Sequence, residues 1–155
     1  MTEGEKTRLI AWNLELRAVH ERLRRALAMA RTAVDREDSG AAARDLLVFC
    51  HGFCAALTGH HRGEDQHLFP ALAAAHPELG ETLRALQQDH SMIAHLLSGL
   101  QAAIDRAESA CELDQHLEGI AAIMESHFRY EERVLDDVLS RLRLEAHIDD
   151  VLGPL

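Results

Sequence analysis

The chain has 155 residues, a formal net charge of -10, and a composition that is 47% hydrophobic but only 4% aromatic. A chain of this length can bury one continuous core, so we expect a single domain over residues 1–155. An apolar set made mostly of Leu, Ala, Ile and Val favours helices over strands. The acidic charge argues against nucleic acid or an anionic membrane as a partner, because both bind basic surfaces.

The N-terminus lacks a basic start followed by an apolar run, and no apolar stretch approaches the roughly 20 residues that cross a bilayer. We therefore expect a cytoplasmic protein that is a monomer or a weak homo-oligomer. Cys50, Cys54 and Cys111 do not have CxxC spacing. We expect buried, reduced thiols; the alternative is a redox role for Cys50 and Cys54, which lie one helical turn apart.

Apolar residues at steps of three and four predict a first helix over residues 5–36 and a second over residues 41–75. Glu37 to Gly40 would separate the two, and His76-Pro77 would end the second. The predicted core-facing residues of the first helix are Leu9, Trp12, Leu16, Val19, Leu23, Leu27, Ala30 and Val34. Those of the second are Leu46, Phe49, Phe53, Leu57, His60, Glu64, Leu68 and Ala71.

Two further amphipathic patterns predict helices over residues 78–106 and 112–142, followed by a short helix within the tail 145–155. Gly153 and Pro154 would end that short helix. Four long helices joined by short loops predict an all-α protein, folded as an antiparallel up-down-up-down four-helix bundle. The predicted core-facing residues of the last two long helices are Leu79, Leu83, Leu86, His90, Ile93, Leu97, Leu100, Ile104, Leu113, Leu117, Ile120, Met124, His127, Glu131, Val134 and Val138.

Each of the four long helices carries one histidine, His20, His60, His90 or His127, in or beside its core-facing stripe. Measured from the predicted turns at about 1.5 Å per residue, the heights of these histidines differ by at most about 6 Å. All four can therefore meet at one level of the bundle. A metal-free bundle is the alternative, but it would leave these buried polar groups without partners.

Glutamates follow two of these histidines after four residues: Glu64 follows His60, and Glu131 follows His127. On a helix this spacing turns both side chains the same way, so they can coordinate one ion or bridge two. Imidazole and carboxylate ligands suit Fe, Mn or Zn, whereas calcium would need more oxygen ligands. The pattern therefore predicts a transition-metal site.

The sequences that begin at His60 and at His127 resemble the two HxxxE signatures of the hemerythrin-like (HHE cation-binding) family. Together with His20 and His90 they give the order H, HxxxE, H, HxxxE, and the resemblance covers residues 8–142. It implies a non-heme centre of two Fe ions, oxo- or hydroxo-bridged, with Zn or Mn as alternatives, and with the two glutamates bridging the metals. The ligands that it implies are His20, His60, Glu64, His90, His127 and Glu131.

One position departs from the oxygen-carrying hemerythrins, which have HxxxH in the third helix and thus a fifth histidine. Here the residue four after His90 is Ala94, and His95 points about 140° away from His90, so we expect it to face solvent. A missing fifth histidine would leave room for water or peroxide at the metal.

Lesser candidates have a simpler alternative. His67 follows Glu64 by three residues and Asn13 precedes His20 by seven, so either could support the metal ligands or line a channel. An ordinary histidine near the bundle end and a satisfied core amide are the respective alternatives. We expect His61 to be exposed, like His51, His76 and His147. The glycines at positions 52, 59 and 63 indicate either entry of a small ligand or close helix packing.

Three functions fit these residues. The first is a di-iron protein that decomposes hydrogen peroxide in a catalase-like reaction. The second is a module that binds O2 or NO as a carrier or sensor, without turnover. The third, a ferritin-like iron oxidase, needs two ExxH repeats, and only Glu64 with His67 fits that pattern.

Overall fold

The computed structural model describes residues 10–35 and 40–154, and the side chains of residues 10–34 and 47–154. Within these ranges the structure contains helices and connecting segments but no strand, which confirms the all-helical prediction for the described residues. The elements in chain order are α1 (Trp12–Asp35), α2 (Gly40–Gly63), the π-helix η1 (Glu64–Leu68), α3 (Phe69–Ala75), the 3-10 helix η2 (Pro77–Leu79), α4 (Gly80–Asp105), α5 (Ala110–Ser140) and α6 (Ile148–Leu152).

The boundaries agree with the sequence pattern except near the N-terminus. Ile10 and Ala11 precede α1 and are not helical, although the first helix was predicted to begin at residue 5. Residues 5–9 and 36 of that prediction lie outside the described ranges, as does Leu9. The short C-terminal helix is present as α6, and Gly153 ends it as predicted.

A π-helix interrupts the predicted helix 41–75. The backbone N–H of Phe69 donates to the carbonyl of Glu64, five residues earlier. Pro70 explains this local widening, because a proline lacks an N–H and its ring collides with the carbonyl four residues before it. The wide turn begins at Glu64, a predicted metal ligand, and π-helical turns of this kind occur frequently at functional sites.

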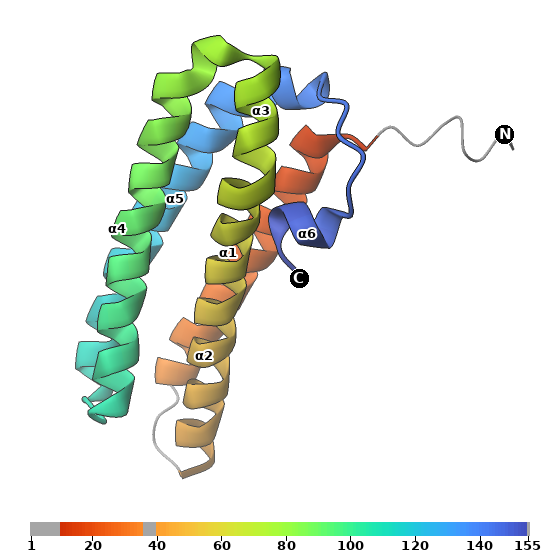
Figure 1. Cartoon of the computed structure of the whole chain (residues 1–155). Coiled ribbons are helices and arrows are strands. Elements are labelled where there is room, and N and C mark those ends of the chain that lie inside the picture. The colour runs from red at the N-terminus through yellow and green to blue at the C-terminus, as the bar shows by residue number, and fades with distance from the viewer. Residues whose placement is uncertain (1–9, 36–39, 155) are drawn as a thin grey trace, which may run out of the picture.

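The four long helical segments lie side by side, and successive ones run in opposite directions (Figure 1). α1 packs against α2 and α5, and α4 packs against α5 and α2. Most residues of their predicted apolar stripes form the buried core, as at Leu23, Leu57 and Leu100, which are fully buried. The predicted core residues that are only partly buried are Phe49, Ala71, Leu79, Val134 and Val138, and the side chain of Leu46 lies outside the described ranges. At the start of α5, Ser109 and Glu112 form a reciprocal capping box, which fixes where that helix begins. None of the described helices has both the length and the apolar character needed to cross a membrane.

The cysteines divide into two kinds. Cys50 and Cys54 are buried, and burial raises the pKa of each thiol to about 11. Both therefore stay protonated and pack as small apolar side chains. Cys111 is exposed, contrary to the expectation that all three are buried.

Candidate metal centre

Seven ionisable side chains meet between the long helices, and all are buried. Five are histidines and two are glutamates. They fall into two groups whose nitrogen and oxygen atoms lie close enough to hold one ion each. The first group is His61, Glu64, His90 and His127, and the second is His20, His60 and Glu131.

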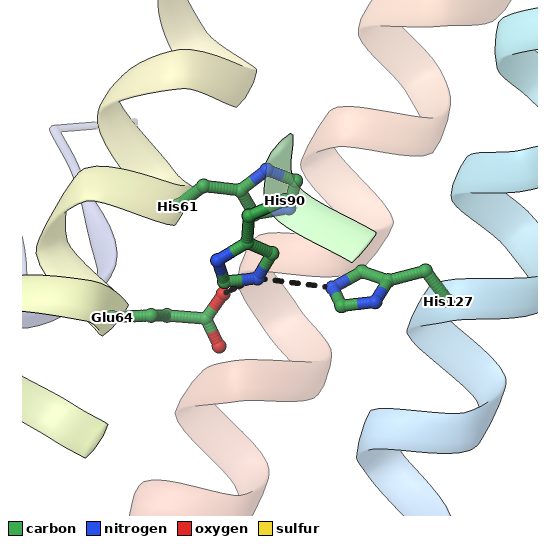
Figure 2. Close-up of side chains that lie close together, drawn as sticks. All are labelled: His61, Glu64, His90 and His127. Carbon is green, nitrogen blue, oxygen red and sulfur yellow. Dashed lines mark hydrogen bonds and ion pairs between the residues drawn. The ribbon is translucent and has the colours of Figure 1, made fainter. Parts of the chain in front are cut away.

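In the first group, His90 from α4 lies between side chains from α2, η1 and α5 (Figure 2). Its Nε2 atom lies 3.2 Å from Nε2 of His127 and 3.4 Å from Oε1 of Glu64. The ring of His61 stacks on the ring of His90, with centroids 3.9 Å apart. Three imidazoles and one carboxylate therefore converge from three sides.

In the second group, the Nε2 atom of His20 lies 3.3 Å from Oε1 of Glu131. The imidazole of His20 stacks on Phe128 with centroids 3.8 Å apart, which fixes the plane of its ring. His60 meets His20 edge-on at a centroid distance of 5.1 Å. This group thus draws on α1, α2 and α5.

Contacts at Nδ1 orient four of the five histidines so that Nε2 is the atom that faces the cluster. A carbonyl or carboxylate oxygen can only accept a hydrogen bond, so the Nδ1 atom that faces it must be the donor. These contacts join Nδ1 of His60 to the Leu152 carbonyl (2.8 Å), Nδ1 of His90 to Asp65 (2.8 Å) and Nδ1 of His127 to Asp89 (3.0 Å). Nδ1 of His20 lies 3.3 Å from Glu132, an ion-pair distance without hydrogen-bond geometry.

Several atoms at the centre of the cluster are buried without any hydrogen-bond partner. They include Nε2 of His20, His60 and His61 and all four carboxylate oxygens of Glu64 and Glu131. The short nitrogen-to-oxygen distances among them lack the direction of a hydrogen bond. An unsatisfied buried polar atom costs roughly 1–3 kcal/mol, and more if charged. A cation at the centre would satisfy these lone pairs together, so the donor set fits transition-metal ions.

Burial and neighbouring carboxylates shift the pKa values of the histidines in opposite directions. Burial lowers the pKa of His60 to about 3 and also lowers that of His61. Both are therefore neutral at neutral pH, the state that coordinates metals. Burial alone would lower the pKa of His90 too, but the carboxylates of Asp65, Glu131 and Glu64 outweigh it and raise the pKa to about 11.

The two glutamates behave as an asymmetric pair. Burial, together with the charge of Glu131, raises the pKa of Glu64 well above its ordinary value. Burial also acts to raise the pKa of Glu131, but the close contacts of its carboxylate with Glu64 and with nearby histidines lower it overall. Without metal, Glu64 is therefore the carboxyl of the pair that holds a proton more readily.

The six residues that the sequence singled out do lie together, but the structure adds a seventh. The prediction that His61 is exposed is wrong, since only 6% of this residue is accessible. The cluster lies at the corner between neighbouring helices, where two adjacent positions of α2 can both face inward. The spacing of three residues between His61 and Glu64 also places them on one helix face, and it could have indicated this role.

The two lesser candidates lie elsewhere. The side chain of His67 is exposed, so it does not join Glu64 as the ExxH pair of a ferritin-like site. The amide of Asn13 donates to Asp136 at 3.4 Å, as expected of a satisfied amide. His95 is exposed as predicted, and Ala94 lines a surface cavity of about 270 Å³ that also reaches His61 and His90.

Comparisons with known proteins give one result. The sequence model of the hemerythrin HHE cation-binding domain matches residues 14–139, which include all seven clustered residues. Comparison with curated proteins and with solved structures gave no match. The family match covers most of the chain, so this chain belongs to the hemerythrin HHE cation-binding family.

Proposed function

We propose that this chain is a cytoplasmic non-heme di-iron protein, folded as an antiparallel four-helix bundle, that decomposes hydrogen peroxide. The observation that carries the proposal is the set of buried nitrogen and oxygen lone pairs without partners at the centre of the cluster. Seven donor side chains exceed what one ion requires, and they already separate into two groups. Imidazole and carboxylate donors suit iron, with manganese and zinc as alternatives.

The carboxylates are suited to bridging two metals. Oε1 of Glu131 lies 3.3 Å from Nε2 of His20, whereas its Oε2 lies 3.3 Å from Nε2 of His127. The two oxygens of one carboxylate therefore face different groups. Oε1 of Glu64 similarly lies between the groups, 3.2 Å from Nε2 of His60 and 3.4 Å from Nε2 of His90. Shared glutamates would hold two ions as a pair.

His61 supplies a fifth histidine to this pair. The fifth histidine of the oxygen-carrying hemerythrins corresponds to position 94, where this chain has alanine, so the sequence led us to expect a centre without it. In the folded chain, His61 of α2 lies on the ring of His90 with its Nε2 buried and unpartnered. We assign His61, His90 and His127 to one metal and His20 and His60 to the other, so the second metal has fewer protein ligands.

The surroundings favour reaction with a small oxidant. When bound, two irons supply an acceptor and donor of two electrons, which is what peroxide decomposition requires. Asp65 and Asp89 accept hydrogen bonds from His90 and His127, and such carboxylates raise the basicity of the imidazoles. Buried rings such as Phe128 exclude bulk water from the centre.

A cavity offers a route for a small molecule. It lies between α2 with η1 on one side and α4 on the other, has a volume of about 270 Å³, and reaches His61 and His90. Most of its other lining side chains are polar. They are Thr58, Arg62, Asp65, Gln66 and Ser91, with Ala94 and Leu97 as the apolar ones. Apolar surface accompanies these polar groups in the lining, so the cavity can admit hydrogen peroxide and small apolar gases alike.

The second candidate is a carrier or sensor that binds O2 or NO without turnover. His61 favours this candidate. The sequence analysis had found one histidine fewer than the oxygen carriers have, and with His61 the centre has five histidines and two carboxylates. Oxygen evolution separates the two functions.

Iron-loaded protein should evolve O2 from hydrogen peroxide, with two molecules of peroxide giving one of O2 and two of water. Glu64→Ala should lose most of this activity, because it removes a carboxylate shared by the two groups. An oxygen electrode measures the rate, with metal-free protein as the control. A wild-type rate no higher than that control, together with an oxygenated spectrum that deoxygenation reverses, would support the carrier instead.

His61→Ala should weaken binding of one of the two metals by more than about 100-fold. Removing a ligand lowers metal affinity at least as much as removing the hydrogen-bond partner of that ligand does. Adding Ala94→His to this variant should recover part of the affinity, since position 94 follows His90 by one helical turn. His95→Ala, at an exposed position on α4, is the matched control. Unchanged metal content in His61→Ala would disprove the fifth-ligand assignment.

Metal binding at pH 7 should release at least two protons per chain, because ligands must be deprotonated. One comes from His90, whose pKa is raised to about 11, and one from Glu64, whose pKa is raised by burial and by Glu131. His20 adds to the release, because Glu131 and Glu132 outweigh the effect of burial and raise its pKa as well. As pH falls these protons compete more strongly, so apparent metal affinity should fall with it. Calorimetry in buffers of different ionisation enthalpy counts the protons. A proton count of zero would contradict these protonation states.

A further inference from the structure

The segment His147–Pro154, which contains α6, packs against the part of the chain that carries two candidate ligands. α6 contacts both α2 and η1, and it lies beside α2 in Figure 1. Val151, Leu152 and Gly153 are fully or almost fully buried there. The approach to this segment is fixed as well, because the indole N–H of Trp12 donates to the carbonyl of Leu144 at 3.3 Å. The segment is therefore held on the outside of α2.

The segment makes one polar contact with the cluster, between the Leu152 carbonyl and Nδ1 of His60. The distance is 2.8 Å and the contact is buried. A carbonyl oxygen has no proton, so the proton lies on Nδ1 of His60. That tautomer leaves a lone pair on Nε2, which lies 3.2 Å from Oε1 of Glu64 and has no hydrogen-bond partner. The α6 backbone thus determines which nitrogen of His60 can bind a metal.

Two glycines allow the segment to come this close. A Cβ atom on Gly63 would lie 2.5 Å from the Val151 carbonyl oxygen and 2.8 Å from its carbon. Gly153 has a φ of +92°, and a Cβ there would lie 2.8 Å from the backbone nitrogen of His60. These obstacles are backbone atoms, which cannot rotate away. Any larger residue at either position must therefore move α6 relative to His60.

We propose that the segment His147–Pro154 is a positioning element of the metal centre: through the Leu152 carbonyl it holds His60 in the tautomer that coordinates, and Gly63 and Gly153 are required for that contact. This inference rests on the proposed metal centre. It assigns the two glycines and the C-terminal segment a role at the His20, His60 and Glu131 group, although they contribute no ligand atom.

The main test compares metal binding by wild type, Gly63→Ala and Gly153→Ala. Each variant should bind metal at the His20, His60 and Glu131 group about 10- to 100-fold more weakly, the usual effect of losing the hydrogen-bond partner of a ligand. The group of His61, Glu64, His90 and His127 should retain its ion more firmly. In a titration with iron or zinc, the affinities of the two binding events should therefore lie further apart in these variants than in wild type.

Two glycine variants and one core variant are the controls. Gly59→Ala places its Cβ 3.7 Å from Pro154, an ordinary contact, and Gly52→Ala meets nothing within 4 Å. Both should bind two ions as wild type does. Leu117→Ala removes a buried side chain ten residues, about 15 Å, from His127 along α5. It should lower the melting temperature while leaving both metal affinities as in wild type. This result would separate a general loss of stability from a loss of positioning.

A measurement on metal-free wild type needs no variant to fold. Nitrogen-15 NMR should find His60 protonated at Nδ1, with a slowly exchanging proton. His60 protonated at Nε2, or wild-type affinity for both ions in both Gly63→Ala and Gly153→Ala, would overturn the positioning role. Wild-type protein that binds no metal while His60 carries its proton on Nδ1 would instead refute the proposed metal centre.

Discussion

The burial of unpaired carboxylate and imidazole lone pairs is the constraint around which the structure is organised. Glu64 and Glu131 are completely buried, and none of their four oxygens has a hydrogen-bond partner. Such groups are unfavourable in an apolar interior unless a counter-charge accompanies them. In the metal-free chain a proton on Glu64 and a charged His90 supply part of that compensation. We infer that two metal ions supply it fully.

Successive layers around this centre determine where the lone pairs point. Nδ1 contacts with Asp65, Asp89 and the Leu152 carbonyl turn three imidazoles so that Nε2 faces inward. Phe128 stacks on His20 and holds a fourth ring. Outside these contacts the apolar stripes of the long helices exclude water, and α6 covers one side of α2. The bundle therefore fixes both the position and the tautomer of its candidate ligands.

Local periodicity was sufficient to predict the helices and six of the seven clustered residues. His90 lies in an apolar heptad, and the spacing of His60 from Glu64 and of His127 from Glu131 places each pair on one face. His61 was missed because no spacing to another ligand was recognised for it, although Glu64 follows it by three residues, and because a helix at the corner of a cluster presents a wider face. The π-helix could have been anticipated from Pro70.

The role of the C-terminal segment could not have been predicted from spacing. Leu152 and His60 are 92 positions apart, and a backbone carbonyl leaves no signature in the sequence. Gly63 was recognised only as a place where either a small ligand enters or another helix packs closely, and the partner that approaches it, Val151, depends on how the tail folds back. Contacts of this kind are set by tertiary packing, which no local pattern specifies.

Metal analysis of purified protein, combined with thermal unfolding before and after chelation, is the direct test of a two-metal centre. We expect two transition-metal ions per chain when iron is supplied, and a lower melting temperature once they are removed, because their removal leaves buried charges without compensation. One zinc ion per chain regardless of iron supply, or an unchanged melting temperature after complete chelation, would contradict it.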